Sequence, residues 1–252
     1  MIYTKTGREA LDGRYLMELP QFNKRHWVSD IFGPRHSFAP APGPQALMAD
    51  MEPQEVVQPH FHGTAQFQLF PAGSGTLGRK AQPIQSLMVQ FKDHHTAYGP
   101  ITAGPNGLTF LSLRVFTGVS APVYLSDPDY RDKLKPSKRR NWLSPHVELS
   151  TPSVMQYRKD AKWESLWDPA TIDDEMNAQV LRLGAGQTVA GPDPKRAAGY
   201  YVFVVNGSML RDGQNLDPWS MTVVEPTESE FEITAGAMGM EALVLEFPLD
   251  YQ

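Results

Sequence analysis

The stretch His60-Phe61-His62-Gly63-Thr64-Ala65-Gln66, followed after six more residues by Gly73, is the most informative part of this chain. Two histidines separated by one residue on an extended strand point to the same side of that strand. Their imidazole rings can therefore converge on one metal ion, and Gln66 stands where such a site needs another ligand. The pattern predicts a metal-binding pocket inside a β-barrel.

Strand signals fill two blocks of the sequence, residues 46–118 and 178–252. Alternating or apolar runs in both blocks stop at Gly, Pro or Asn, which is typical of short strands joined by tight turns. The first block has runs at 65–70, 86–91 and 108–115, and the second has runs at 180–183, 200–205, 221–224 and 241–247. The long strands that start at Gln66 and Tyr200 lie about 134 residues apart, and the order of signals is the same in both blocks. This order predicts an internal duplication.

The remaining segments carry weaker signals. Residues 1–45 are rich in proline and are expected to form an N-terminal arm, and residues 119–177 are expected to connect the two blocks. The connection contains the basic run 133–140. Because the whole chain is acidic, we expect this run to be a solvated linker rather than a nucleic-acid patch.

Composition bounds the class of protein. The chain has 252 residues, a net charge of −5 and no cysteine, so it has no disulfide framework and no thiolate metal site. The acidic balance provides no basic footprint for nucleic acid. No apolar run approaches the ~20 residues that span a bilayer, and the N-terminus lacks the apolar core of a signal peptide. We therefore expect a cytoplasmic protein that binds neither nucleic acid nor membrane.

The residues quoted above resemble the cupin superfamily (RmlC-like proteins) in its two-domain, bicupin form. The first cupin motif reads G-x5-H-x-H-x3-4-E-x6-G, and His60, His62 and Gly73 match its spacing. Two elements differ, because Gln66 replaces the glutamate and Gln54 replaces the leading glycine. The resemblance implies an all-β fold of two double-stranded β-helix (jelly-roll) barrels. It places a metal site in the barrel at 46–118 and a degenerate barrel at 178–252.

The remaining ligand of the first barrel is open. The second cupin motif supplies a last histidine, and the corresponding region holds His94, His95 and Tyr98. Adjacent residues on a strand point to opposite faces, so His94 and His95 cannot both reach one metal. His95 is preferred slightly over His94, and Tyr98 is a serious rival. Direct ligation by Gln66 is equally open, since an amide oxygen is a weak ligand for a divalent metal.

In the second block, Tyr200 stands at the position of the motif's glutamate, and the two histidine positions fall near Pro194 and Arg196. No histidine follows His146, so the second barrel is expected to hold no metal and to serve as structure. Three other histidines lie in loop-like, proline-flanked contexts and are interpreted as surface or structural: His26, His36 and His146.

Imidazole-rich sites suit one divalent transition metal, and Fe, Ni, Zn, Mn and Cu all stay open. Glutamine carries no charge to compensate the metal, so the site is expected to favour a small anionic ligand. Two functions follow. One is a metal-dependent enzyme, either dioxygenase-like or a Lewis acid, acting on a small oxygen-rich organic anion. The other is a non-catalytic small-molecule binding or sensor protein on the same barrel. Edge strands make a homodimer a further expectation.

Overall fold

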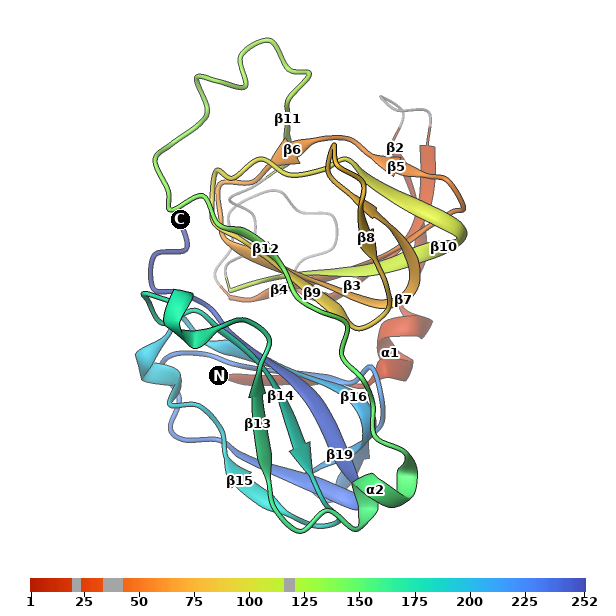
Figure 1. The fold of residues 1–252 in the computed structure, drawn as a ribbon, viewed down its shortest axis with the longest axis vertical. Coiled ribbons are helices and arrows are strands. Elements are labelled where there is room, and N and C mark those ends of the chain that lie inside the picture. The colour runs from red at the N-terminus through yellow and green to blue at the C-terminus, as the bar shows by residue number, and fades with distance from the viewer. Residues whose placement is uncertain (20–23, 34–42, 116–120) are drawn as a thin grey trace. The chain divides into compact units, whose positions relative to one another are not determined.

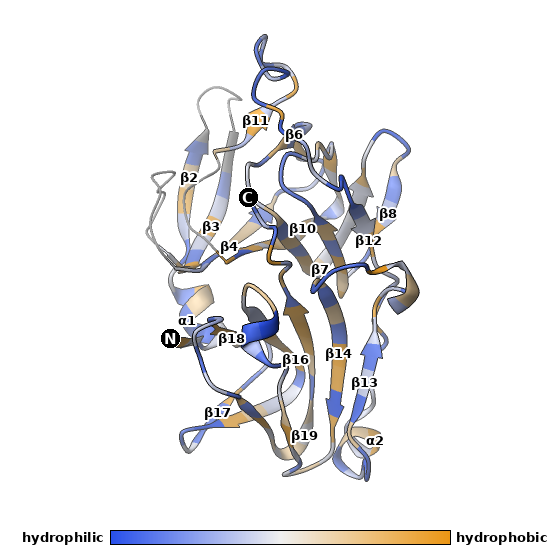
Figure 2. Ribbon diagram, turned by 90° about the vertical axis from the view of Figure 1, so that its left-hand side faces the viewer, coloured by the Kyte–Doolittle hydropathy of each residue, from blue (hydrophilic) through white to orange (hydrophobic). Residues whose placement is uncertain are grey.

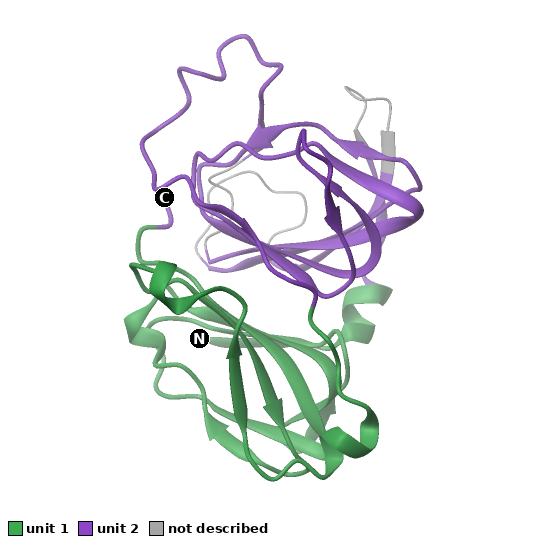
Figure 3. Ribbon diagram, in the orientation of Figure 1, with its two compact units in different colours: residues 1–12, 147–250 green, residues 13–146, 251–252 purple. Residues whose placement is uncertain are grey.

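The structure is a computed structural model that describes residues 1–19, 24–33, 43–115 and 121–252. The chain forms two compact units, and it passes from one to the other after residues 12, 146 and 250 (Figure 3). Unit 1 comprises residues 1–12 and 147–250, and unit 2 comprises residues 13–146 and 251–252. Each unit is built mainly of antiparallel strands (Figure 1).

Unit 2 contains a twisted antiparallel sheet with the path β12-β9-β7-β10-β4-β3-β2, in which β5 also pairs with β10 and β8 with β7. The short strands β6 and β11 pair separately. The strand bounds are β2 Tyr15–Leu19, β3 Lys24–Phe32, β4 Gln45–Met51, β5 Val56–Val57, β6 His60–Phe61, β7 Gln66–Leu77, β8 Gln82–Ile84, β9 Met88–Lys92, β10 Ile101–Arg114, β11 Val123–Tyr124 and β12 Asn141–Leu143.

Unit 1 contains a second antiparallel sheet with the path β1-β18-β16-β19-β14-β13, in which β15 pairs with β19 and β17 with β16. The helices are short. The bounds are β1 Ile2–Lys5, α1 Gly7–Asp12, α2 Pro152–Gln156, β13 Lys162–Ser165, η2 Pro169–Thr171, β14 Asn177–Leu183, β15 Thr188–Ala190, η3 Pro194–Arg196, β16 Tyr200–Arg211, β17 Gln214–Leu216, β18 Met221–Val224 and β19 Glu232–Glu246.

The two sheets repeat one another. The central path β9-β7-β10-β4 of unit 2 corresponds to β18-β16-β19-β14 of unit 1. Strands β7 and β16 have the same length, 12 residues, and start at Gln66 and Tyr200. Both central pairs, β7 with β10 and β16 with β19, carry irregularities in their register. The duplicated strand order therefore agrees with the order that the sequence predicts.

Gly73 and Gly207 occupy equivalent irregularities in β7 and β16. Both have a left-handed backbone, with φ of 82° and 68°. A Cβ atom at Gly73 would collide with the carbonyl oxygen of Gly107, and one at Gly207 would collide with that of Gly239. Only glycine fits such a conformation at so close an approach of two backbones. The spacing of Gly73 in the motif thus has a structural cause.

The units divide the chain at other places than the sequence predicts. The described residues of 1–45 do not form a separate arm, because β1 pairs with β18 in unit 1 while β2 and β3 extend the sheet of unit 2 through β4. The predicted connection 119–177 is divided as well. Its first part belongs to unit 2 and contains β11 and β12, and its last part contributes β13 to unit 1.

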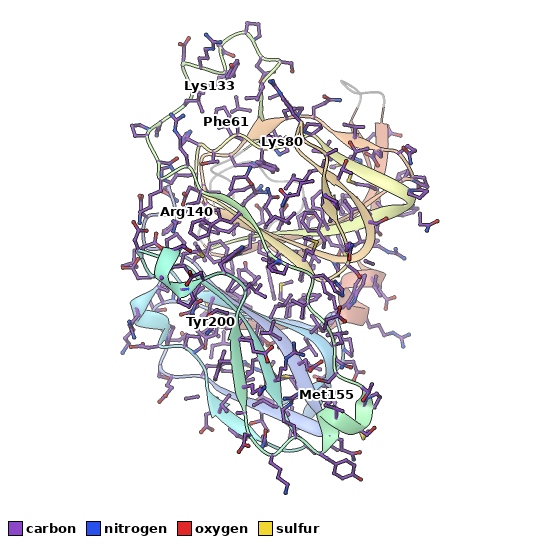
Figure 4. All side chains as sticks on the ribbon, in the orientation of Figure 1. Phe61, Lys80, Lys133, Arg140, Met155 and Tyr200 are labelled. Carbon is purple, nitrogen blue, oxygen red and sulfur yellow. The ribbon has the colours of Figure 1, made fainter. Side chains whose placement is uncertain are left out.

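The basic run at 133–140 is mostly exposed, as expected for a linker, with one exception. Arg140 is buried and forms a two-pronged ion pair with Asp93, in which Nη2 and Oδ1 are 2.7 Å apart. Its guanidinium also lies over the rings of Phe91 and Trp142. Arg140, which is labelled in Figure 4, directly precedes β12, and its contacts hold the end of the basic run against unit 2.

The interiors of the two units differ in polarity. Strands β14, β16 and β19 are largely apolar (Figure 2), and they enclose an apolar core that includes Leu181, Val202 and Val244. Unit 2 has an apolar cluster around Phe70, Ile101 and Phe110, but it also buries many polar side chains. In the part of the chain that the structure describes, no helix is long and apolar enough to cross a membrane.

Candidate functional site: a polar cavity in unit 2

A cavity of about 590 Å³ opens inside unit 2. Its size lies in the range of small-molecule sites in proteins. Strands β2, β3, β4, β7 and β10 and the segment from Glu55 to His62 supply the walls. Along β10 the side chains of Phe110, Ser112 and Arg114 line it, because alternate residues of a strand share one face.

Four of the residues that the sequence singles out meet here. His60, His62 and Tyr98 line the cavity, with ring centroids 5.0 Å apart for the two histidines and 4.4 Å apart for His60 and Tyr98. Gln66 is buried beside them and its Nε2 donates to the Tyr98 hydroxyl at 2.9 Å. The two rings of the H-x-H pair therefore lie close together, with His60 on β6 and His62 just beyond its end.

The hydrogen bonds form a chain with one consistent direction. Arg114 Nε donates to Gln66 Oε1 at 3.0 Å, and Gln66 in turn donates to Tyr98. His60 Nδ1 lies 2.7 Å from the carbonyl oxygen of Gln58, which can only accept, so Nδ1 carries the proton. The Tyr98 hydroxyl, 2.6 Å from His60 Nε2, must then be the donor to that nitrogen. This chain requires a neutral His60.

Burial explains the protonation states along the chain. Desolvation, helped by the positive charges of Lys92 and Arg114, lowers the pKa of His60 to about 4. Burial also raises the pKa of Tyr98 well above its usual range, so the phenol keeps its proton. Both shifts favour the proton positions that the hydrogen bonds require.

Arg114 is the residue that organises one end of the cavity. The guanidinium is buried, its Nη1 donates to Gln45 Oε1 at 2.6 Å, and its Nη2 lies 3.2 Å from His62 Nδ1. The amides of Gln45 and Gln66 and the imidazole of His62 thus contact the Arg114 guanidinium, a permanent cation, and fix its orientation. A second basic side chain, Lys92, is fully buried with its Nζ 3.4 Å from the centre of the Tyr98 ring. Burial and the neighbouring Arg114 lower the pKa of Lys92.

The other predicted ligands lie elsewhere. His95 has a left-handed backbone, φ 53°, and its amide donates to the carbonyl of His62. Its ring lies 5.7 Å from that of Phe61, which neighbours His60 on β6 and so faces the opposite side of the strand. His94 stacks edge-on against His95. Tyr98, the rival, is the residue that joins His60.

The three remaining histidines also have different outcomes. His26 is not on the surface: it is buried and lines the cavity, with Nδ1 2.7 Å from Glu55 Oε1. His146 is exposed and bonds the carbonyl of Ser86, in agreement with a surface or structural role. His36 lies outside the described residues.

The side chains in this arrangement do not fit a divalent metal. His60 Nε2 accepts from Tyr98, Gln66 Oε1 accepts from Arg114, and Arg114 also lies against His62. The lone pairs that a metal would need are thus directed at protein donors, and one donor is a cation. A metal ion bound by these atoms would also lie close to the positive charge of Arg114. Two like unit charges ~4 Å apart repel by about 4 kcal/mol near a protein surface. Among the described residues, no three His, Asp or Glu side chains gather in a metal-binding group.

Sequence reasoning missed Arg114, Gln45 and the pair of His26 and Glu55. A signal exists for Arg114, since it follows Phe110 and Ser112 at alternate positions in the apolar run 108–115 and so had to face the same side as they do. Gln45 and His26 carry no such signal, because they lie in the proline-rich segment 1–45, which is expected to form an arm.

The equivalent place in unit 1 has a different character. Tyr200 stands where unit 2 has Gln66, and its register partner on β19 is Glu246, the counterpart of Arg114. Asn177 donates to Glu246 as Gln45 accepts from Arg114. The charge at this position is therefore inverted between the two barrels, and unit 1 contains no histidine. Figure 4 labels Tyr200 within this barrel.

Comparisons with known proteins establish the fold. A putative dioxygenase from Nostoc punctiforme has a TM-score of 0.61 at 11% identity, over 99% of this chain and 84% of that one. Bacterial pirin YhhW from Escherichia coli in complex with nickel(II) has 0.58 at 12%, over 98% and 99%. A deletion mutant of oxalate decarboxylase from Bacillus subtilis has 0.57 at 10%, over 100% and 78%. The fold is that of a two-domain cupin.

The jelly-roll architecture implied by the sequence resemblance is thus confirmed. No protein-family model matches this chain, and no curated protein matches it either. At 10–12% identity the structural matches establish the two-barrel cupin fold and leave the reaction open. The activities and the nickel named for those proteins belong to those proteins.

Proposed function

We propose that the cavity of unit 2 binds a small organic anion and that Arg114 anchors its negative charge. The observation that carries the proposal is the guanidinium itself, buried in a cavity wall and oriented by Gln45, Gln66 and His62. A planar guanidinium with fixed N–H groups matches the geometry of a carboxylate better than any other side chain does.

Further polar groups lie at this end. Lys92 lies behind the Tyr98 ring, outside the residues that line the cavity. Polar side chains of Gln68 and Ser112 line the wall next to Arg114 and supply neutral hydrogen bonds. Oxalate decarboxylase, one of the proteins of the same fold, is named for an organic dianion. This chain would bind its anion through a positively charged protein group rather than through a metal.

A metal-dependent enzyme, dioxygenase-like or Lewis-acid, is the second candidate. The convergence of His60 and His62 favours it, since the rings are 5.0 Å apart. His60 also holds its Nδ1 proton on a backbone carbonyl, which is how metal-binding histidines are commonly oriented. A metal at this place would need Arg114 to move away and Tyr98 to turn. A cytoplasmic location and a homodimer stay predictions from the sequence.

The test is a titration of EDTA-treated, tag-free protein with benzoate, octanoate and decanoate, each beside its uncharged amide. We expect the carboxylates to bind and the amides to bind at least 10-fold more weakly, because a hydrogen bond to a charged group contributes about 1.5–3 kcal/mol. Elemental analysis of the same preparation before EDTA accompanies it. Stoichiometric metal, with carboxylate binding only after the metal is restored, would favour the second candidate.

A further inference from the structure

The cavity of unit 2 has a second polar end. His26 and Glu55 both line it and are both buried, with His26 Nδ1 2.7 Å from Glu55 Oε1. The other oxygen of Glu55 accepts the backbone amide of Glu52 at 3.0 Å, which holds the carboxylate in place. A buried pair of this kind costs desolvation and is seldom needed for stability alone.

The register of the sheet places this pair far from Arg114. In the β3–β4 and β4–β10 pairings, Val28, Ala49 and Phe110 form one row across the sheet, and Asp30, Leu47 and Ser112 form the next. The next row beyond Ser112 on β10 contains Arg114. The next row on the other side of Phe110 contains Leu108 on β10, Met51 on β4 and His26 on β3. These ends are six residues apart along β10, or about 20 Å between backbone positions.

The segment from Glu55 to His62 likewise has one end at His26 and the other at Arg114. The chain from Glu55 to His62 runs along the cavity, and its first residue bonds His26 while its last lies against Arg114. Between the two ends the walls include apolar side chains: Val28, Leu47, Ala49, Val56, Val57 and Phe110. The cavity is thus polar at both ends and largely apolar between them.

The chemistry of the distal end is that of an acceptor. His26 Nδ1 lies 2.7 Å from a carboxylate oxygen, which accepts, so Nδ1 carries a proton, and in the neutral form of the ring Nε2 is an acceptor. A further carboxylate, Glu18, is exposed on the adjoining strand β2, next to Met17, which pairs with His26. Asp30 lies nearer the Arg114 end, in the row of Ser112, and accepts from the Tyr15 hydroxyl at 2.6 Å. These groups suit a ligand atom that donates a hydrogen bond.

We infer that the ligand is bipolar: an elongated organic acid whose carboxylate lies at Arg114 and whose far end carries a hydrogen-bond donor, a hydroxyl or an ammonium group, at His26 and Glu55. This inference rests on the proposed function, because it takes Arg114 as the carboxylate anchor. Once side-chain reach is subtracted from about 20 Å, roughly 10 Å is left for the apolar middle of the ligand.

The experiment compares decanoate, 10-hydroxydecanoate and 10-aminodecanoate by calorimetric titration of the full chain, below their aggregation limits. The wild type is expected to bind one or both substituted acids about 10-fold more tightly than decanoate, the effect of one well-placed hydrogen bond. The hydroxy and amino arms distinguish a neutral donor from a cationic one.

The variants test the residues. His26→Leu alone leaves a buried carboxylate, so the main variant is the double His26→Leu and Glu55→Leu, which removes both partners. In it the ratio of the dissociation constants of decanoate and the preferred substituted acid is expected to fall to about 1. His146→Leu, an exposed histidine of the same unit, is the control and should keep the wild-type ratio.

The outcomes separate the two proposals. Equal affinity of the wild type for all three acids would overturn the bipolar ligand and leave the anion site standing. A preference that survives in the double variant would overturn the role of His26 and Glu55. Failure of all three acids to bind would overturn both proposals, and circular dichroism of each variant establishes that loss of binding is not loss of fold.

Discussion

The hydroxyl of Tyr98 lies 2.6 Å from Nε2 of His60, and this contact decides how the cavity of unit 2 works. The hydroxyl donates to the lone pair of Nε2, which a metal ion would need from His60. It is also the last donor in a chain of hydrogen bonds that begins at Arg114 and passes through Gln66. Each member of the chain has its proton position fixed by the next. The site is therefore organised around a protein cation.

Gln66→Glu is expected to weaken carboxylate binding by 10-fold or more. The new carboxylate would take the place of the amide oxygen that accepts from Arg114 Nε, and it would cancel the charge that the ligand needs. Calorimetric titration with benzoate measures the effect. Lys80→Gln removes one exposed positive charge in the same unit and serves as the control for long-range charge. Equal affinity in Gln66→Glu and wild type would remove the electrostatic argument.

Tyr98→Phe is expected to lower the free energy of unfolding by about 1–3 kcal/mol. The change removes a hydroxyl that bonds both Gln66 and His60 and leaves buried polar atoms without that partner. Urea denaturation measures it, with Tyr157→Phe at a 75% exposed tyrosine as the matched control. A loss no larger than in the control would mean that the hydrogen-bond chain contributes little to stability.

The pKa of His60 predicts a pH dependence of stability. The folded pKa is about 4 and the unfolded value is about 6.5, so the unfolded chain binds more protons between these values. The free energy of unfolding should therefore fall as the pH decreases from about 6.5 to 4, by roughly 3 kcal/mol from this one group. Urea midpoints across that range, in wild type and His60→Gln, check the expectation. The variant should show a flatter profile, and identical profiles would assign the dependence to other groups.

The repeated strand order could be predicted from the sequence, but the additional strands that complete the two sheets could not. Period-two alternation and turn residues located β7, β10 and β16, since these signals are local. Pairing between distant segments is not local. Nothing in residues 2–5 indicates that they would add to β18, and nothing in the proline-rich start indicated that β2 and β3 extend the sheet of unit 2.

The same limit explains the site. The spacing of His60 and His62 brings their rings together although β6 ends at Phe61, and Gly73 is required by the irregularity in β7. Tyr98 rather than His95 lies beside His60, and the sequence does not indicate the left-handed turn at His95. Arg114 reaches His62 from the far end of β10, a contact that only the sheet register brings about.

The central claim is that Arg114, and no metal, anchors an anion in unit 2, and its most direct test is a calorimetric titration of metal-free wild type and Arg114→Gln with decanoate. The account predicts that the wild type binds without added metal and that Arg114→Gln binds about 10–100-fold more weakly, the value of one charge-assisted contact. Equal binding by the variant, or binding by the wild type only after a divalent metal is added, would contradict it.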